Sequence, residues 1–376
     1  MPDQAGATIR VLIVDDSAIF RRALAAQLGR YDDIQVVGSA VDPYDAREKI
    51  AALRPDVLTL DIQMPRMDGL TFLQALMTHH PLPVVVVSSI APPDSEVGLR
   101  ALELGAVEVV AKPGSTFSTP HDPHLLARAI RTAAVARLSL FVSPALAIRP
   151  ATPREPAGAL TPLAGPAAWE PTWRVIVIGA STGGTVAIET VLASLPAHAP
   201  PVVVVQHMPA GFTAAFAQRL DSICAVRVHE AQQGEEPVAG EALIAPGGRH
   251  LLLRQHGHGF VVQLKDGPAV YHQRPSVDVL FQSVAACAGG HAIGVLLTGM
   301  GADGANGLLA LRQRGAFTIA QDEQTSVVFG MPKEAIKLGA AEVVLPLHHI
   351  GPAIVEHMGQ AHVTGASTPT STRTPK

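Results

Sequence analysis

The chain has 376 residues, of which 48% are hydrophobic and 4% aromatic, so it is long enough for about two or three domains with mainly aliphatic cores. Its formal net charge of −4 argues against a nucleic-acid binder, and no apolar run reaches the roughly 18 residues that a membrane span needs. The first ten residues lack a secretory signal pattern, and the two cysteines, Cys224 and Cys287, have no disulfide-framework or metal-ligand spacing. We therefore expect a cytoplasmic protein that is not inserted in a membrane.

The N-terminal third alternates strand and helix patterns five times. Apolar runs predict strands near residues 9–14, 34–38, 57–60, 84–88 and 107–110, each followed by a helical pattern. The first helix can begin after Ser17, a favoured N-cap residue type, and end at Gly29. This alternation predicts an α/β domain with a five-stranded parallel sheet covered by helices on both faces.

Polar side chains follow these predicted strands at one edge of the sheet. Asp15 and Asp16 follow the first strand, Asp61 the third, Ser88 the fourth and Lys112 the fifth. Three carboxylates at one edge repel one another unless a cation neutralises them, and oxygen ligands of this type suit Mg²⁺. Any one of these acids alone is more simply an ordinary solvated loop residue, but the complete set favours a built site.

A proline-rich segment separates the two halves of the chain. Residues 141–172 contain seven prolines among Ala, Gly and Thr, without a sustained helical or strand period. This composition predicts a flexible Pro/Ala-rich linker. We therefore predict an N-terminal domain over residues 1–140, a second domain over 173–358 and a disordered tail over 359–376.

Three motifs in the second domain each follow an apolar strand pattern. GASTGG supplies Ser181, QHMP supplies His207 and TGMGADG supplies Asp303. Buried parallel strands read as short apolar runs, and ligand sites in open α/β sheets lie at the carboxyl ends of such strands. The three side chains are the types that an acyl-transfer triad needs, and the motif order differs from that of the α/β hydrolases.

Each motif also has a plainer interpretation. The glycine-rich turn resembles a dinucleotide site, but an acidic ribose ligand is expected about 20 residues on, where the chain has Gln206 and His207. Asp303 starts an apparent helix over 303–314, so it is equally a candidate helix cap. His256 and His258 alternate with glycines and indicate a hairpin turn more than a metal site. A DNA-binding output is disfavoured because residues 173–358 carry 11 basic and 14 acidic residues.

Residues 9–137, with VDDS, DIQMPRMDG, VSS and KPG, resemble the receiver domains of two-component response regulators. The resemblance implies a flavodoxin-like fold in which Asp61 is phosphorylated by a histidine kinase. It also implies that Asp15, Asp16 and Asp61 hold Mg²⁺ with the Gln63 backbone carbonyl. Ser88 and Lys112 are then expected to sense the phosphoryl group.

Residues 174 to about 357 resemble the catalytic domain of the chemotaxis protein-glutamate methylesterases, also called CheB-type. The motifs that carry this resemblance are GASTGG, QHMP, APGGRH, RPSVDVLFQSVA, TGMGADGANG and QDEQTSVVFGMPKEAI. The resemblance implies a doubly wound, mainly parallel α/β domain, hydrolysis of glutamyl γ-methyl esters on chemoreceptors and deamidation of selected receptor glutamines. One departure is Gln63, where relatives of this type commonly have Glu.

The resemblance implies that Ser181 is the nucleophile, His207 the general base and Asp303 the residue that orients the base. Backbone N–H groups near Thr182 and Met300 are candidate oxyanion donors, and no metal is needed for the ester chemistry. Arg274 is either a contact for an acidic substrate or a structural cation.

We also expect the receiver to control access to the second domain. An unphosphorylated receiver that docks over the sheet edge obstructs a protein substrate, and phosphorylation at Asp61 then favours an open form. The alternative is a receiver that activates the catalytic domain directly.

Overall fold

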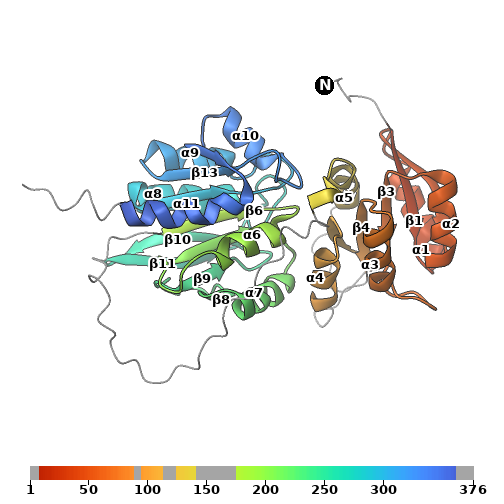
Figure 1. Ribbon diagram of the computed structural model, residues 1–376, viewed down its shortest axis with the longest axis horizontal. Helices are drawn as coiled ribbons and strands as arrows, with labels where there is room; N and C mark the ends of the chain where they lie inside the picture. The colour runs from red at the N-terminus through yellow and green to blue at the C-terminus, as the bar shows by residue number, and fades with distance from the viewer. Residues whose placement is uncertain (1–7, 89–94, 113–123, 141–174, 361–376) are drawn as a thin grey trace, which may run out of the picture.

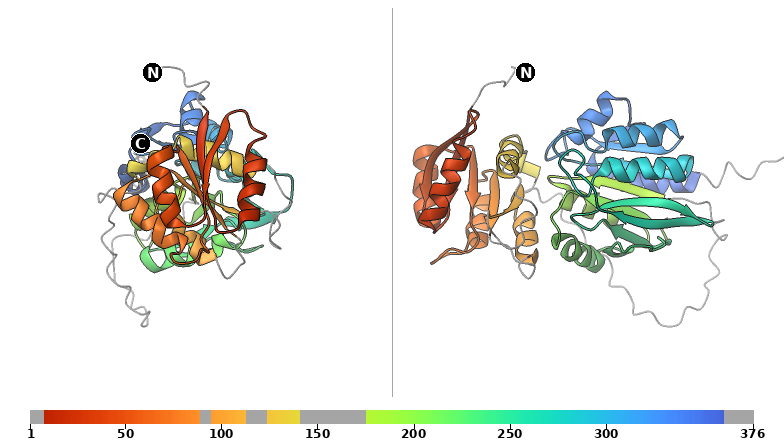
Figure 2. Two further views of the ribbon diagram at one scale, coloured as in Figure 1. Left: turned by 90° about the vertical axis from the view of Figure 1, so that its right-hand side faces the viewer. Right: turned by 180° about the vertical axis from the view of Figure 1, so that it is seen from behind.

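The protein is described by a computed structural model that covers residues 8–88, 95–112, 124–140 and 175–360. Two α/β domains lie end to end along the long axis of the molecule (Figures 1 and 2). The predicted linker at 141–172 and the tail beyond residue 360 lie outside the described residues. No helix in the described part of the chain combines the length and the apolar character that crossing a bilayer requires.

The N-terminal sheet confirms the predicted five-stranded parallel arrangement. Its strands are β1 (Ile9–Val14), β2 (Ile34–Ala40), β3 (Val57–Leu60), β4 (Val84–Ser88) and β5 (Glu108–Ala111). They lie in the order β2-β1-β3-β4-β5, which is the flavodoxin-like order. The strand order reverses beside β1, so the loops after β1 and β3 open at the point where ligand sites form.

Helices cover both faces of this sheet. They are α1 (Ala18–Leu28), α2 (Pro43–Leu53), α3 (Gly69–His79), α4 (Ser95–Glu103) and α5 (Leu125–Ala134), with a short 3₁₀ turn, η2, at Leu138–Leu140. As predicted, Ser17 caps α1 by accepting a hydrogen bond from the Phe20 N–H, and Gly29 ends the helix. Helices α1 and α5 bury apolar side chains against one face, while α2, α3 and α4 pack on the other.

The second domain is built on a seven-stranded sheet in which every recorded strand pair is parallel. Its strands are β6 (Val175–Ala180), β7 (Val202–Gln206), β8 (Arg227–Glu230), β9 (Glu241–Ile244), β12 (Ala292–Leu296), β13 (Phe317–Gln321) and β14 (Val343–Leu345). The order is β14-β13-β12-β6-β7-β9-β8. After β6 the chain forms β7 on one side of β6, and it later returns to form β12 on the other side. The edge beyond β6 and β12 is therefore the topological switch point, where open α/β sheets bind ligands.

The two faces of this sheet have separate cores. Alternating strand residues face either α6 (Gly184–Ala193), α7 (Phe212–Ile223) and α11 (Leu347–Gln360), or α8 (Val277–Cys287), α9 (Ala305–Gln313) and α10 (Met331–Lys337). A short 3₁₀ turn, η4 (Gly289–His291), precedes β12. The last helix, α11, continues two residues past the predicted boundary at 358. This arrangement confirms the doubly wound, mainly parallel α/β class.

A β-hairpin adds a second, two-stranded sheet to this domain. Strands β10 (His250–His256) and β11 (Gly259–Lys265) are antiparallel, and His256 pairs with Gly259 across the turn. Gly257 in this turn has a φ of 55°, a conformation that glycine adopts without strain. The histidine and glycine alternation therefore forms a hairpin turn, as predicted.

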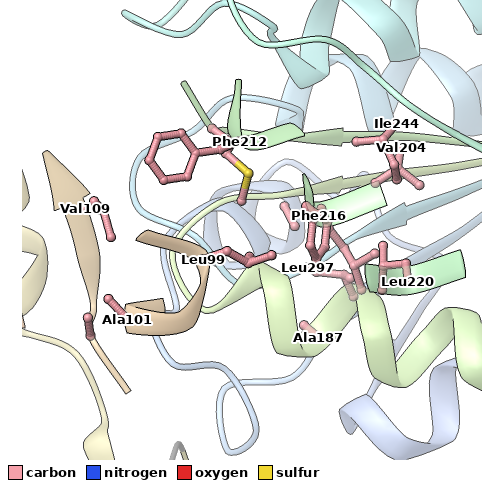
Figure 3. Close-up of a cluster of buried hydrophobic side chains, with 14 of the residues drawn as sticks. Leu99, Ala101, Val109, Ala187, Val204, Phe212, Phe216, Leu220, Ile244 and Leu297 are labelled. Carbon is pink, nitrogen blue, oxygen red and sulfur yellow. The ribbon is translucent and has the colours of Figure 1, made fainter. Parts of the chain in front are cut away.

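The two domains contact each other through α4. Leu99 on α4 is 5% exposed and belongs to an apolar cluster that includes side chains of α6 and α7. Figure 3 shows Leu99 on the side of this cluster that faces the receiver, next to Phe216 of the second domain, with Leu220 farther away. Arg219 on α7 adds a polar contact, with Nη1 2.7 Å from Glu103 Oε1 on α4.

Candidate active site

The three motifs meet at the switch-point edge of the second sheet. Ser181 directly follows β6, His207 directly follows β7, and Asp303 lies in the loop between β12 and α9. The Ser181 N–H donates to the Thr298 carbonyl at 3.0 Å, and the His207 N–H donates to the Ala180 carbonyl at 3.1 Å. These backbone bonds hold the three loops together, so residues more than 100 positions apart share one site.

His207 and Asp303 form a buried pair. The His207 Nε2 atom lies 2.7 Å from Asp303 Oδ2, and the two side chains are 4% and 2% exposed. A carboxylate accepts hydrogen bonds, so Nε2 carries the proton and Nδ1 is left as the basic nitrogen. His207 Nδ1 is buried and has no hydrogen-bond partner among the described residues. This orientation leaves the proton-accepting atom free.

The N-terminus of α8 holds the Asp303 carboxylate. Asp303 Oδ1 accepts hydrogen bonds from the Ser276 hydroxyl at 2.8 Å and the Asp278 N–H at 2.9 Å, while Oδ2 accepts from the Val277 N–H at 2.8 Å. Burial alone raises the pKa of Asp303, but the hydrogen bond and charge of His207, with the donors from α8, outweigh it and lower this pKa below its ordinary value. The carboxylate therefore stays ionised beside the imidazole.

This geometry decides between two interpretations of Asp303. A helix cap would hydrogen-bond to the first turn of α9, yet the N-cap of α9 is Gly304, at a φ of 89° and without a side-chain hydrogen bond. The Asp303 side chain points instead to His207 and to α8. Asp303 is therefore not the cap of its own helix.

Close packing sets the turn that carries Ser181. Gly183 has a φ of 76°, in the left-handed region that favours glycine. A Cβ added to Gly184 would lie 2.1 Å from Gln206 Oε1, and one added to Gly299 would lie 2.6 Å from the Ser181 Cβ. These contacts explain why glycines surround the serine. Within the described part of the chain, Ser181 Oγ and His207 Nδ1 are not hydrogen-bonded, a contact that in unliganded enzymes often forms only with substrate.

The two candidate oxyanion donors differ in their surroundings. Thr182 is buried at the start of the turn before α6, and its carbonyl accepts a hydrogen bond from the Thr298 hydroxyl at 3.0 Å. Met300 is 46% exposed and does not line the cavity that contains Ser181. The position of Thr182 near the N-terminus of α6 suits an oxyanion better, because helix N-termini stabilise negative charge.

A cavity of about 520 Å³ lies between the two domains. The wall from the second domain includes Ser181, Thr182 and His207, together with most of the segment from Gly267 to Arg274. The opposite wall is formed mainly by β5 and α5 of the N-terminal domain. Arg274 lines this cavity and also donates to the Gly267 carbonyl at 2.6 Å, so it has a structural contact as well as access to the cavity.

The acidic residues of the N-terminal domain also converge. Ligand oxygens of Asp15, Asp16 and Asp61 all lie within 4.8 Å of one another. Lys112 Nζ lies 2.7 Å from both Asp15 Oδ2 and Asp61 Oδ2. Burial is the main cause that raises the pKa of Asp61, against the lowering effect of Lys112. Three carboxylates with one ammonium group carry surplus negative charge, and this donor set fits a hard cation such as Mg²⁺.

Ser88 is the last residue of β4, where its backbone pairs with Ala111 beside Lys112, while its side chain lies outside the described part of the structure.

The sequence patterns did not identify several residues that support the site in the second domain. Gln206 Nε2 donates to the carbonyls of Ser181, at 2.9 Å, and His207, at 3.2 Å. Ser276 donates a hydrogen bond to Asp303. Its position in the RPSVDV motif is the feature of the sequence that could have pointed to a role in the site.

Comparison with known proteins agrees with this architecture. The family model described as CheB methylesterase matches residues 176–354, and the response regulator receiver domain matches residues 11–117. Protein-glutamate methylesterase/protein-glutamine glutaminase 2 of Syntrophus aciditrophicus (strain SB) is 51% identical over 351 residues, covering 92% of this chain and 98% of that relative. Protein-glutamate methylesterase/protein-glutamine glutaminase 5 of Anaeromyxobacter dehalogenans (strain 2CP-C) is 53% identical over 364 residues, covering 94% and 98% respectively.

Among solved structures, the catalytic domain of the Thermotoga maritima CheB methylesterase is 41% identical, with a TM-score of 0.48, covering 49% of this chain and 98% of that one. Both curated relatives are matched over nearly their whole length, through the receiver and through the domain that carries Ser181, His207 and Asp303. The chain therefore belongs to the CheB methylesterase family, in the form that joins a response regulator receiver domain to the methylesterase domain.

Proposed function

We propose that this chain hydrolyses glutamate γ-methyl esters, and deamidates specific glutamines, on methyl-accepting chemoreceptors. The names of its full-length relatives support this substrate class. The observation that carries the proposal is the buried His207–Asp303 pair, whose free Nδ1 atom lies in the same site as the Ser181 hydroxyl. We place the reaction in the cytoplasm, in agreement with two free cysteines.

The reaction begins at the Ser181 hydroxyl. Ser181 Oγ attacks the ester carbonyl carbon while His207 Nδ1 accepts the hydroxyl proton. The tetrahedral intermediate then collapses, the bond to the methoxy oxygen breaks, and His207 returns the proton so that methanol leaves. Water attacks the acyl-enzyme with His207 again as base, which releases the glutamate carboxylate and restores Ser181. With a glutamine substrate the leaving group is ammonia.

Asp303 and α6 supply the electrostatic part of this mechanism. Asp303 holds the Nε2–H tautomer of His207 and stabilises the imidazolium that forms during attack. The Thr182 N–H is our first candidate for the oxyanion contact, with Met300 as the second. No step of this ester chemistry requires a metal ion.

The receiver controls access to this site. Its β5 and α5 residues form the wall opposite Ser181 and His207, so a chemoreceptor segment cannot enter the cavity until this wall moves. Lys112 links the two regions, because it lines the cavity while its ammonium group contacts Asp61. Phosphorylation of Asp61 by a chemotaxis histidine kinase changes the partners of Lys112 and shifts the domains toward an open arrangement.

Asp15, Asp16 and Asp61 are the residues that would hold Mg²⁺ in the receiver. When bound, the ion supplies positive charge that offsets the phosphoryl oxygens. Lys112 provides a second positive charge on the same edge, and Ser88, at the end of β4, is the expected partner of a phosphoryl oxygen.

Methanol release from membranes that contain methylated chemoreceptors tests the proposal directly. We expect release by the wild-type protein, stimulation by a small-molecule phosphodonor, and a loss of about 10⁴-fold or more in Ser181→Ala. If the phosphodonor did not change methanol release by the wild-type protein, the proposed regulation by phosphorylation would be contradicted. Near-normal methanol release by Ser181→Ala would contradict the assignment of Ser181 as the nucleophile.

A further inference from the structure

A second histidine is buried behind the triad. His250, the first residue of β10, is 5% exposed. Its Nδ1 accepts a hydrogen bond from the Ser276 N–H at 3.2 Å, and its Nε2 lies 3.0 Å from the Pro268 carbonyl oxygen. The backbone N–H only donates and the carbonyl only accepts, so both contacts require a neutral imidazole with its proton on Nε2.

One contact of His250 leads to the triad. Ser276 is fully buried, its N–H is held by His250, and its hydroxyl donates to Asp303 Oδ1 at 2.8 Å. Ser276 also caps α8, whose next two N–H groups donate to the same carboxylate. The position of Ser276 therefore affects three of the hydrogen bonds that Asp303 receives.

The other contact leads to the substrate side. Pro268 belongs to the segment from Gly267 to Arg274 that lines the cavity facing Ser181. Tyr271 and His272, at the tip of this segment, have φ values of 51° and 62°, a strained conformation for residues with a Cβ. Such a turn persists only when its surroundings hold it, and His250 closes the loop by joining Pro268 to Ser276.

We propose that His250 is a positioning residue that couples the substrate-facing segment 267–274 to Asp303 through Ser276. The contact with Ser276 sets the hydroxyl and the first turn of α8 against the Asp303 carboxylate, and so acts on the chemical step. The contact with Pro268 sets the wall of the cavity, and so acts on substrate binding. This inference rests on the proposed roles of Ser181, His207 and Asp303.

Two substitutions separate the contacts. In His250→Asn, the side-chain oxygen can replace Nδ1 as the acceptor for the Ser276 N–H, but no group reaches Pro268. In His250→Gln, the terminal NH₂ can replace Nε2 as the donor to Pro268, but the Ser276 N–H loses its partner. We expect His250→Asn to raise KM several-fold with kcat retained, and His250→Gln to lower kcat about tenfold with KM retained.

Two assays measure these effects. The first is the rate at which a fluorophosphonate probe labels Ser181, which reports nucleophile activation without any chemoreceptor. The second is methanol release at varied receptor concentration, expressed per labelled Ser181 so that unfolded protein does not count. The matched controls are His256→Asn and His256→Gln on the exposed hairpin turn, where we expect unchanged values in both assays.

Ser276→Ala supplies a second, independent variant. We expect slower labelling and lower kcat at unchanged KM. The double variant with His250→Gln should be no slower than the slower single variant, because both substitutions act through Ser276 on the same Asp303 carboxylate. Equal labelling rates, kcat and KM per labelled serine in wild type and both His250 variants would overturn the proposal, even if melting temperatures fall. The predicted difference in labelling would uphold it even if wild type released no methanol, an outcome that would refute only the proposed substrate.

Discussion

Replacing Asp303 with Asn tests the proposed triad most sharply. The carboxylate receives four hydrogen bonds, from the His207 Nε2–H, the Ser276 hydroxyl, and the N–H groups of Val277 and Asp278. An Asn side chain offers one oxygen and one NH₂ in the same place. Either orientation therefore brings the NH₂ group against one buried backbone N–H.

The expected magnitudes follow from these contacts. One unpaired buried N–H costs about 1–3 kcal/mol, which lowers the melting temperature of a domain of this size by about 2–12 °C. If the NH₂ group faces His207, it forces the proton onto Nδ1 and removes the base. If the oxygen faces His207, the tautomer survives but the negative charge that stabilises the imidazolium is lost. By analogy with serine proteases, we expect turnover to fall about 10⁴-fold.

The measurement is methanol release per Ser181 that reacts with a fluorophosphonate probe, together with thermal unfolding. Asp278→Asn is the matched control, because Asp278 is also buried and its backbone N–H, which donates to Asp303, is kept in Asn. Its Oδ1 accepts a hydrogen bond from the Gly307 N–H at 2.6 Å, which the Asn side-chain oxygen can also accept. We expect the control to retain turnover within about tenfold and to unfold near the wild-type temperature. If Asp303→Asn lowered the melting temperature but kept turnover within tenfold, the role of Asp303 would be to hold α8, and the triad would be refuted.

Three further predictions concern the receiver. Asp61→Ala should keep basal methanol release and lose the response to a phosphodonor. A full-sized response in this variant would contradict the assignment of Asp61 as the phosphoacceptor. Arg219→Ala removes the contact with Glu103 across the domain boundary, so basal release should rise by about 1.4-fold to fivefold, the scale of a partly exposed ion pair, whereas a decrease would indicate that docking activates the enzyme. Burial raises the pKa of Glu108, on the cavity wall, to about 7 despite the opposing charge of Arg128. We expect opening to expose this carboxyl and to return its pKa toward the ordinary value, so docking is favoured by the protonated form and weakens as pH rises toward about 7. Basal release by wild type relative to Glu108→Gln should therefore increase between about pH 5 and pH 7, and a ratio independent of pH would show that Glu108 does not report docking.

The proposed control by the receiver is supported by two separate contacts between the domains. The first is the packing of α4, with Leu99, against α6 and α7. The second lies directly before η2, where the Arg137 N–H donates to the Val327 carbonyl at 2.9 Å and its guanidinium contacts Glu323. Val327 packs beside Gly183, in the turn that carries Ser181. The receiver therefore touches both the helix pair α6 and α7 and the loop that packs beside the turn carrying Ser181.

Much of the architecture was determined by the sequence alone. Alternating strand and helix patterns predicted the first parallel sheet, and short apolar runs indicated buried parallel strands in the second domain, because hydrophobic periodicity and cap residues such as Ser17 act over a few neighbouring positions. The placement of Ser181, His207 and Asp303 at one edge also followed from sequence, because motifs that end parallel strands converge wherever the strands are neighbours. The predicted hairpin at His256 formed for a similarly local reason.

Only the tertiary structure decided which atoms meet. The sequence left Asp303 equally open as a cap of α9, and the approach of α8 turned its carboxylate toward His207 instead. Neither the link from His250 to Ser276, 26 positions along the chain, nor the docking of Leu99 against the second domain has a local signature. The physical reason is that a hydrogen bond or an apolar contact between distant segments depends on how whole helices and strands cross. That crossing is set by the packing of complete cores, whereas hydrophobic periodicity in the sequence indicates only the face that each element buries.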